Sequence, residues 1–259
     1  MLLATDIGNT EITLGLFSGD RCTTHWRLTT VVRRTPDEWA AMFTSYLRHA
    51  GYSTDEVRAA VIASVAPRVT EPVSSGIEKA IGIDAVQIGP SLDLPVVLDV
   101  EDPQQVGADR IINTLAAARI YKRDTIVVDF GTATTFDCIT SEGRFLGGVI
   151  APGLRAAADE LSHRAAMLPA TDLTAPDRVI GRRTEECIRS GVLYGAADSV
   201  DGLIRRIREE WPTDAVPYPV ATGGLAYKVV PFSKEIDEIE PNLTLFGLKI
   251  VASYVGLKW

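Results

Sequence analysis

Short apolar runs alternate with tight polar turns over the first 28 residues of the chain. Residues 2–5 form an apolar run, residues 12–17 form an alternating run, and a third, more polar run covers residues 22–28. The turns between them are Asp6-Ile7-Gly8-Asn9-Thr10 and Ser18-Gly19-Asp20. Runs of this length separated by Gly and Asp turns are typical of antiparallel strands. The pattern therefore predicts a three-stranded antiparallel unit at the start of the chain.

Helical and strand patterns follow this unit. Residues 35–38, Thr-Pro-Asp-Glu, combine a capping box with a proline at the first helical position. Apolar side chains then recur at helical spacing between Trp39 and Leu47. Residues 57–65 include several β-branched residues and are nearly all apolar, as in a strand that is covered on both faces. The rest of this half is predicted to hold a helix over 70–81, a strand over 85–88 and a helix over 107–121.

The pattern of the first half begins again at Thr125. An apolar strand ends in Asp129, a Gly turn and a second strand follow, and a second Gly turn leads into a third strand over 145–150. Gly143 lies 14 residues after Asp129, and Gly19 lies 13 residues after Asp6. The repeat predicts a duplication with two similar α/β domains, residues 1–121 and 122–259. Chance similarity between two three-stranded meanders is the alternative.

Composition narrows the class of protein. The chain has 259 residues, of which 46% are hydrophobic, and a formal net charge of -8. An acidic chain is not expected to bind nucleic acid, and no apolar run approaches the ~20 residues that span a bilayer. The N-terminus lacks the features of a signal peptide, so we expect a cytoplasmic protein with no membrane partner. Three scattered cysteines indicate neither a disulfide framework nor a zinc site.

The two Asp-x-Gly turns are candidates for phosphate binding. Asp6 and Asp129 each end an apolar strand, where a carboxylate is costly unless it is solvated or faces a cation. The glycine two residues later permits a turn whose amides point outward, and the hydroxyls of Thr10, Thr132 and Thr134 add donors. One such motif is usually a plain hairpin turn. Two such motifs at matching places in the two halves favour a site that binds successive phosphates of one nucleotide, with cations held by the carboxylates.

Two further segments carry candidate chemistry. Thr222-Gly223-Gly224 follows an apolar run and precedes a predicted helix, so it is either an adenosine seat or an ordinary strand-to-helix turn. Asp109 and Arg110 stand at the start of the predicted helix over 107–121. Asp109 is either a helix-dipole partner or a base that accepts a hydroxyl proton while Arg110 holds an anionic group. P-loop and dinucleotide-binding signatures are absent from the sequence.

Together these motifs make the chain resemble the type III pantothenate kinases, within the acetate kinase, hexokinase, Hsp70 and actin superfamily. The segments that carry the resemblance are residues 6–10, 34–38, 63–67, 107–110, 129–135, 147–148, 152–153, 190–191 and 222–224. The resemblance implies two duplicated ribonuclease H-like domains (βββαβα) in an actin-like ATPase architecture with an interdomain cleft. It also implies ATP-dependent phosphorylation of pantothenate to 4′-phosphopantothenate, the first step of coenzyme A biosynthesis.

The resemblance also assigns roles to residues. Asp109 would be the general base, Asp129 would bind the monovalent cation, K⁺ or NH₄⁺, and Asp6 would serve Mg²⁺, in part through water. The ATP contacts would be Asp6, Ile7, Gly8, Asn9, Thr10, Glu11, Ile12, Thr13 and Thr132, with Gly223 and Gly224 as the adenosine turn. The pantothenate contacts would be Val100, Gly107, Ala108, Asp109, Arg110 and Thr184. A homodimer would build this pocket at its interface.

Three positions depart from the family pattern. Val100 stands where many members have a tyrosine, Arg183 stands where asparagine is common, and Glu11 follows the first phosphate turn. These departures bear on affinity rather than on the type of reaction. Two alternatives stay open: a non-catalytic accessory or regulatory protein on the same fold, and a kinase of another small hydroxy acid. The intact Asp6, Asp109 and Asp129 argue against the first.

Overall fold

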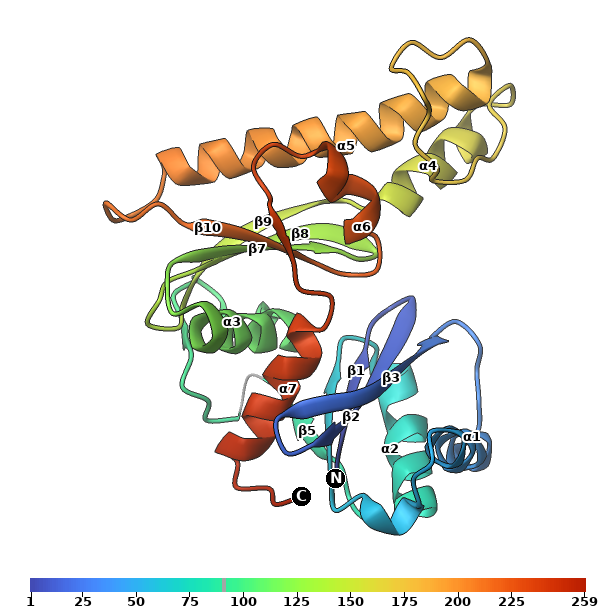
Figure 1. The fold of residues 1–259 in the computed structure, drawn as a ribbon, viewed down its shortest axis with the longest axis vertical. Coiled ribbons are helices and arrows are strands. Elements are labelled where there is room, and N and C mark those ends of the chain that lie inside the picture. The colour runs from blue at the N-terminus through green and yellow to red at the C-terminus, as the bar shows by residue number, and fades with distance from the viewer. Residues whose placement is uncertain (90–91) are drawn as a thin grey trace. The chain divides into compact units, whose positions relative to one another are not determined.

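The computed structural model describes residues 1–89 and 92–259 (Figure 1). The chain divides into two compact units, which we describe separately. Unit 1 comprises residues 1–96, 101–116 and 243–259, and unit 2 comprises residues 97–100 and 117–242. Each unit is built on one β-sheet with helices packed against it, as the predicted α/β class requires.

The sheet of unit 1 starts with the three antiparallel strands that the sequence predicts. Its strands are β1 (Leu2–Ile7), β2 (Glu11–Ser18), β3 (Arg21–Thr29), β4 (Ala59–Ser64) and β5 (Val86–Ile88), in the spatial order β3-β2-β1-β4-β5. The pairs β1–β2 and β2–β3 are antiparallel, whereas β4 lies parallel to β1 and β5 lies parallel to β4. The carboxyl ends of β1 and β4 therefore meet at one edge of the sheet.

The helices of unit 1 follow the predicted order. They are α1 (Pro36–His49), the 3₁₀ turns Thr54–Glu56 and Pro103–Gln105, α2 (Pro67–Ile81), the first part of α3 (Ala108–Tyr121) and α7 (Leu243–Tyr254). The Thr35 hydroxyl accepts a hydrogen bond from the Glu38 amide, and the Thr35 amide donates to the Glu38 carboxylate, so the predicted capping box is confirmed. Trp39 and Phe43 of α1 are buried in the core over this sheet. Helix α2 starts three residues earlier than predicted because Pro67 occupies its first turn.

Unit 2 repeats the strand order of unit 1. Its strands are β6 (Val97–Leu98), β7 (Thr125–Phe130), β8 (Ala133–Ile139), β9 (Arg144–Pro152), β10 (Tyr218–Thr222) and β11 (Glu238–Ile239), in the order β11-β10-β7-β8-β9-β6. If the short edge strand β6 is left out, the spatial order read from the other edge is β9-β8-β7-β10-β11. Counted along the chain, this is the third, second, first, fourth and fifth strand, which is the spatial order of unit 1. The repeated topology supports the predicted duplication.

Long helices cover the sheet of unit 2. The helical elements are α4 (Leu154–Arg164), α5 (Thr184–Glu209), the short α6 (Ala226–Val229) and the 3₁₀ turn Val230–Phe232. Figure 1 shows α5, in orange, running along one face of this sheet. Leu193, Ala197 and Ile204 of α5 are buried in one core cluster with Ile126 and Val128 of β7. In the part of the chain that the structure describes, no helix is long and apolar enough to cross a membrane.

The compact units differ from the predicted domains 1–121 and 122–259 at three places: residues 97–100 and 117–121 belong to unit 2, and residues 243–259 belong to unit 1. Helix α7, at the end of the chain, belongs to unit 1. A Cβ atom at Gly247 would lie 2.4 Å from Ile112 Cγ2, and a Cβ atom at Gly15 would lie 3.0 Å from Leu245 Cδ1. The helix therefore packs tightly against α3 and β2. The division at residue 121 stays a prediction about the duplicated halves, since a sequence repeat does not reveal which sheet a terminal helix covers.

Candidate functional site

The first Asp-x-Gly turn, which the sequence predicts to bind phosphate, joins β1 to β2. The amide of Gly8 donates to the Glu11 carbonyl at 2.9 Å, and a Cβ atom at Gly8 would lie 2.9 Å from the same oxygen, so only glycine fits here without a shift. Asn9 and Thr10 at the tip of the turn are exposed, and Asp6 is half-buried near the end of β1. The turn has the shape that the sequence predicts, with its tip open to a ligand.

Strand alternation places Glu11 on the same face as Asp6. Asp6 pairs with Thr13 across the β1–β2 ladder, and Ile7 and Ile12 point to the opposite face, into the core. Glu11, two residues from Thr13, therefore faces the same way as Asp6. Its carboxylate lies 3.5 Å from Nε of the exposed Arg27. This ion pair offsets part of the repulsion that a carboxylate would exert on phosphate.

Asp109 lies in the first turn of α3, as the sequence predicts. It is half-buried, and its Oδ1 atom accepts a hydrogen bond of 2.8 Å from the Arg110 amide. Burial raises the pKa of the Asp109 carboxyl above its usual value, against the smaller lowering effect of this hydrogen bond and of the Arg110 charge. A carboxylate whose proton affinity is raised is suited to accept a proton from a hydroxyl.

Gly107 makes room for this carboxylate. A Cβ atom at Gly107 would lie 2.4 Å from Asp109 Oδ1 and 3.5 Å from Cγ1 of Val65, which follows β4. Any larger residue at position 107 would displace the Asp109 side chain. The structure thus gives a local reason for the Gly-Ala-Asp-Arg sequence at the start of α3.

The second phosphate turn joins β7 to β8 in unit 2. Its Gly131 amide donates to the Ala133 carbonyl at 3.0 Å, which corresponds to the Gly8 bond of the first turn. Asp129 pairs with Thr135, six residues later, whereas Asp6 pairs with Thr13, seven residues later. The second turn is therefore one residue shorter, and Thr132 is exposed at its tip.

The paired glycines lie directly against this second turn. Gly223 has φ of +89°, and a Cβ atom there would lie 2.3 Å from Asp129 Oδ1 and 2.7 Å from the Phe130 amide nitrogen. The Leu225 amide donates to the Phe130 carbonyl at 3.1 Å. The predicted helix after the glycines is α6, which has only four residues. The structure brings together two motifs that are 94 residues apart in the sequence.

A helix N-terminus, for which the sequence alone predicts no role, also lies against the second turn of unit 2. Gly153 is the N-cap of α4, and a Cβ atom there would lie 2.2 Å from the Thr132 carbonyl oxygen. The turn that carries Thr132 therefore packs against the start of α4, where the helix dipole favours negative charge. The sequence signal for the start of α4 is the Pro152-Gly153 pair at the end of β9.

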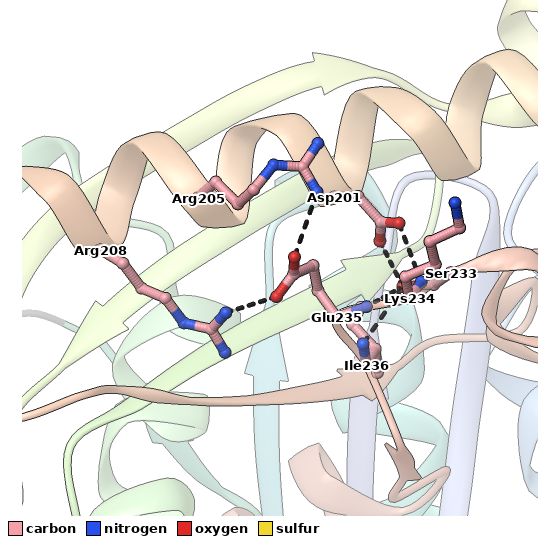
Figure 2. A network of polar contacts seen from close by, with 7 residues as sticks. All are labelled: Asp201, Arg205, Arg208, Ser233, Lys234, Glu235 and Ile236. Carbon is pink, nitrogen blue, oxygen red and sulfur yellow. Dashed lines mark hydrogen bonds and ion pairs between the residues drawn. The ribbon is translucent and has the colours of Figure 1, made fainter.

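A buried polar network holds the segment that follows α6 (Figure 2). Asp201 of α5 is 3% exposed and accepts hydrogen bonds from the Ser233 hydroxyl, at 2.5 Å, and from the Lys234 amide, at 2.8 Å. Glu235 forms ion pairs with Arg205 and Arg208, also on α5. The network ties the chain between α6 and β11 to the long helix.

The residues expected to contact a small substrate are divided between the units. Thr184 is the first residue of α5 and is exposed, next to a pocket of about 510 Å³. The pocket is lined by Ala166, Met167, Leu168, Pro169, Arg183, Thr184 and Glu185. Val100 lies beside Gly147 of β9, and a Cβ atom at Gly147 would lie 3.8 Å from Val100 Cγ1. Both belong to unit 2, whereas Gly107, Ala108, Asp109 and Arg110 belong to unit 1.

The donor set for metals is sparse. Among residues 1–89 and 92–259, no group of three or more His, Cys, Asp and Glu side chains is arranged to hold an ion. If Asp6 or Asp129 held a cation, most of its other ligands would have to be phosphate oxygens, backbone carbonyls or water. Such sites suit a hard cation that accompanies a nucleotide.

Comparison with known proteins identifies relatives along nearly the whole chain. A family model described as type III pantothenate kinase matches residues 2–206. The type III pantothenate kinase of Moorella thermoacetica is 43% identical over 251 residues, which cover 97% of this chain and 98% of the relative.

Solved structures share the fold at low sequence identity. A conserved putative Baf family transcriptional activator from Campylobacter jejuni has a TM-score of 0.61 at 19% identity, with 98% of each chain covered. A ROK hexokinase from Thermus thermophilus has a TM-score of 0.53 at 15% identity, with 99% of each chain covered. The chain has the actin-like ATPase fold of such kinases, so the fold class expected from the sequence is confirmed.

Proposed function

Because this chain belongs to the type III pantothenate kinase family, we propose that it transfers the γ-phosphoryl group of ATP to the terminal hydroxyl of pantothenate. The products are ADP and 4′-phosphopantothenate, and the reaction opens coenzyme A biosynthesis. The structural observation that carries the proposal is Asp109, whose half-buried carboxylate has a raised pKa at the start of α3.

Asp109 acts as the general base. Its carboxylate accepts the proton of the terminal hydroxyl, the hydroxyl oxygen bonds to the γ-phosphorus, and the bond to the β–γ bridging oxygen breaks as ADP leaves. The hydrogen bond from the Arg110 amide fixes the orientation of the carboxylate. Catalysis of phosphoryl transfer depends mainly on such positioning and on electrostatic stabilisation.

The two phosphate turns and the glycine pair hold ATP. The exposed tips of the turns at Asn9, Thr10 and Thr132 offer amide and hydroxyl donors to the phosphates. Gly223 and Gly224 form the turn at which the adenosine is seated. Mg²⁺, when bound, neutralises charge on the phosphates, and Asp6 holds it directly or through water.

Asp129 holds a monovalent cation, K⁺ or NH₄⁺. The proposal is supported by its single half-buried carboxylate beside the backbone of Gly223. We place the protein in the cytoplasm as a homodimer whose interface completes the pantothenate pocket. Thr184 and Val100 contribute to that pocket, and Arg110 balances the carboxylate of pantothenate.

A coupled assay of ADP release tests the function. Purified protein should release ADP with pantothenate in K⁺ or NH₄⁺ buffer, and more slowly in Na⁺ buffer. Asp109→Asn should lower kcat by roughly 10²–10⁴-fold, because the base is lost while the shape is kept. Asp84→Asn, at an exposed position of the same unit, is the matched control and should keep wild-type turnover. Undiminished turnover of Asp109→Asn would remove Asp109 from its role.

The same assay separates the alternatives. Release of ADP only with a different hydroxy acid would identify another substrate, which the valine at position 100 makes worth testing. Absence of ADP release with every acid, together with calorimetry that shows no ATP-dependent binding of pantothenate, would leave a non-catalytic protein on this fold.

A further inference from the structure

Thr30 closes the first phosphate turn from the end of the neighbouring strand. It directly follows β3 and is 6% exposed. Its hydroxyl donates to the Gly8 carbonyl at 2.8 Å, and its amide donates to the Thr10 carbonyl at 2.9 Å. One residue, 20 positions beyond the turn in sequence, thus binds two of the three carbonyl groups of Gly8, Asn9 and Thr10.

These bonds determine where the turn directs its donors. In a trans peptide the carbonyl and the following amide point in opposite directions. The Gly8–Asn9 peptide is trans, as are the other peptides of the described residues. Because the Gly8 carbonyl points at Thr30, the Asn9 amide points away from Thr30. The Asn9 amide is therefore held outward at the exposed tip of the turn, where a phosphate oxygen can accept from it.

Glycine makes this restraint necessary. Gly8 has no Cβ atom, so the Gly8–Asn9 peptide has more rotational freedom than a peptide that follows any other residue. The amide of Gly8 is fixed by the Glu11 carbonyl, but that bond does not orient the carbonyl of Gly8. The buried hydroxyl of Thr30 supplies the missing restraint, and water has little access to replace it.

We propose that Thr30 is a positioning residue for ATP, which acts by orienting the Gly8–Asn9 peptide so that the Asn9 amide binds a phosphate oxygen. The inference rests on the proposed kinase function and deepens it, since it adds a residue that touches neither substrate. Its role is specific to the nucleotide, so its loss should change the KM for ATP more than the KM for pantothenate.

Two substitutions at position 30 test the role of the hydroxyl. Thr30→Val keeps the shape and the backbone amide but removes the donor to the Gly8 carbonyl, whereas Thr30→Ser keeps the donor. Thr29→Val is the matched control, because the Thr29 hydroxyl accepts from the Val31 amide and does not bind the turn. Each variant is assayed for ADP release with ATP and pantothenate varied in turn, and its Tm is measured.

We expect Thr30→Val to raise the KM for ATP by roughly tenfold, because an Asn9 amide that is no longer held outward loses its hydrogen bond to a charged phosphate oxygen. Thr30→Ser should restore most of the affinity, and Thr29→Val should match the wild type. An unchanged KM for ATP in Thr30→Val would overturn the inference, and so would an equal rise in both KM values.

If the wild-type protein releases no ADP with pantothenate, the proposed function fails instead. Calorimetry with ADP alone then tests the role of Thr30, and equal affinity of Thr30→Val and the wild type for ADP overturns the inference.

Discussion

The carboxylate of Asp129 lies against the backbone of Gly223, in the space that a side chain at position 223 would fill. The φ of +89° at Gly223 belongs to the left-handed region, and a Cβ atom there would lie 2.3 Å from Asp129 Oδ1. Two independent constraints, backbone conformation and the neighbouring carboxylate, therefore require glycine at this position.

Gly223→Ala should destabilise the protein and impair nucleotide binding. We expect a loss of about 1–3 kcal/mol from the strained backbone, and a rise in the KM for ATP because the Asp129 carboxylate must move. Urea denaturation and the coupled assay measure the two effects. Gly202→Ala is the control, since a Cβ atom at Gly202 within α5 meets nothing within 4 Å. It should be neutral or slightly stabilising. Equal behaviour of the two variants would contradict the contact.

Asp129→Asn should reduce the response to the monovalent cation. The substitution keeps the shape beside Gly223 but removes the negative charge that would hold K⁺ or NH₄⁺. We expect the ratio of rates in K⁺ and Na⁺ buffer to approach one, with a lower rate in both. Titration of K⁺ at saturating ATP measures the response. A variant that keeps the wild-type K⁺ dependence would assign the cation to another group.

Asp109 should make stability depend on pH in an unusual direction for a carboxylate. Its pKa is raised by burial, so the folded protein binds the proton more tightly than the unfolded chain does. The contribution of this group to the free energy of unfolding therefore falls as pH rises from the usual value of 3.8 through the raised pKa. At neutral pH the buried charge is a net cost.

Asp109→Asn should accordingly raise the Tm at neutral pH, while it abolishes most of the activity. The gain over the wild type should shrink as the pH is lowered towards 3.8, where the wild-type carboxyl becomes protonated. Thermal denaturation over this range gives the measurement. Asp84→Asn, at an exposed position of the same unit, serves again as the control. A gain that grows on acidification would contradict the assigned direction.

Asp201→Ala should destabilise unit 2. The substitution leaves the half-buried Ser233 hydroxyl and the Lys234 amide without their acceptor, at a cost of about 1–3 kcal/mol. Asp198→Ala, at an exposed position on the same helix, should change the free energy of unfolding by less than about 0.5 kcal/mol. Urea denaturation compares the two variants. If their midpoints coincide, the network is not a source of stability.

Local signals predicted most of the elements. The capping box at Thr35 and Glu38 determines the start of α1 through hydrogen bonds between neighbours, so the sequence alone suffices. The apolar run over 57–65 predicted β4, since burial on both faces leaves a composition signature. Gly19 and Gly143 adopt φ of +57° and +83° in the predicted hairpin turns. In each case a few adjacent residues contain the cause.

The contacts that assemble the site were not predicted. Gly223 meets Asp129, Gly153 meets the Thr132 carbonyl, and Thr30 binds the carbonyl of Gly8. Each pair is joined by strand pairing or helix packing between segments well separated in sequence, and each glycine alone would also fit an ordinary turn. The sequence therefore predicts the two Asp-x-Gly turns but not the residues that hold them in place.

The position of α7 has a consequence for the order in which the protein is completed during synthesis. The strands of unit 1 leave the ribosome first, yet their sheet lacks the cover of residues 243–259 until all of unit 2 has been made. Unit 2 contains every one of its own elements once residue 242 has emerged. The half that is translated first is thus the half that is finished last, and a chain that ended at residue 242 would have all the elements of unit 2 but a first sheet without this helical cover.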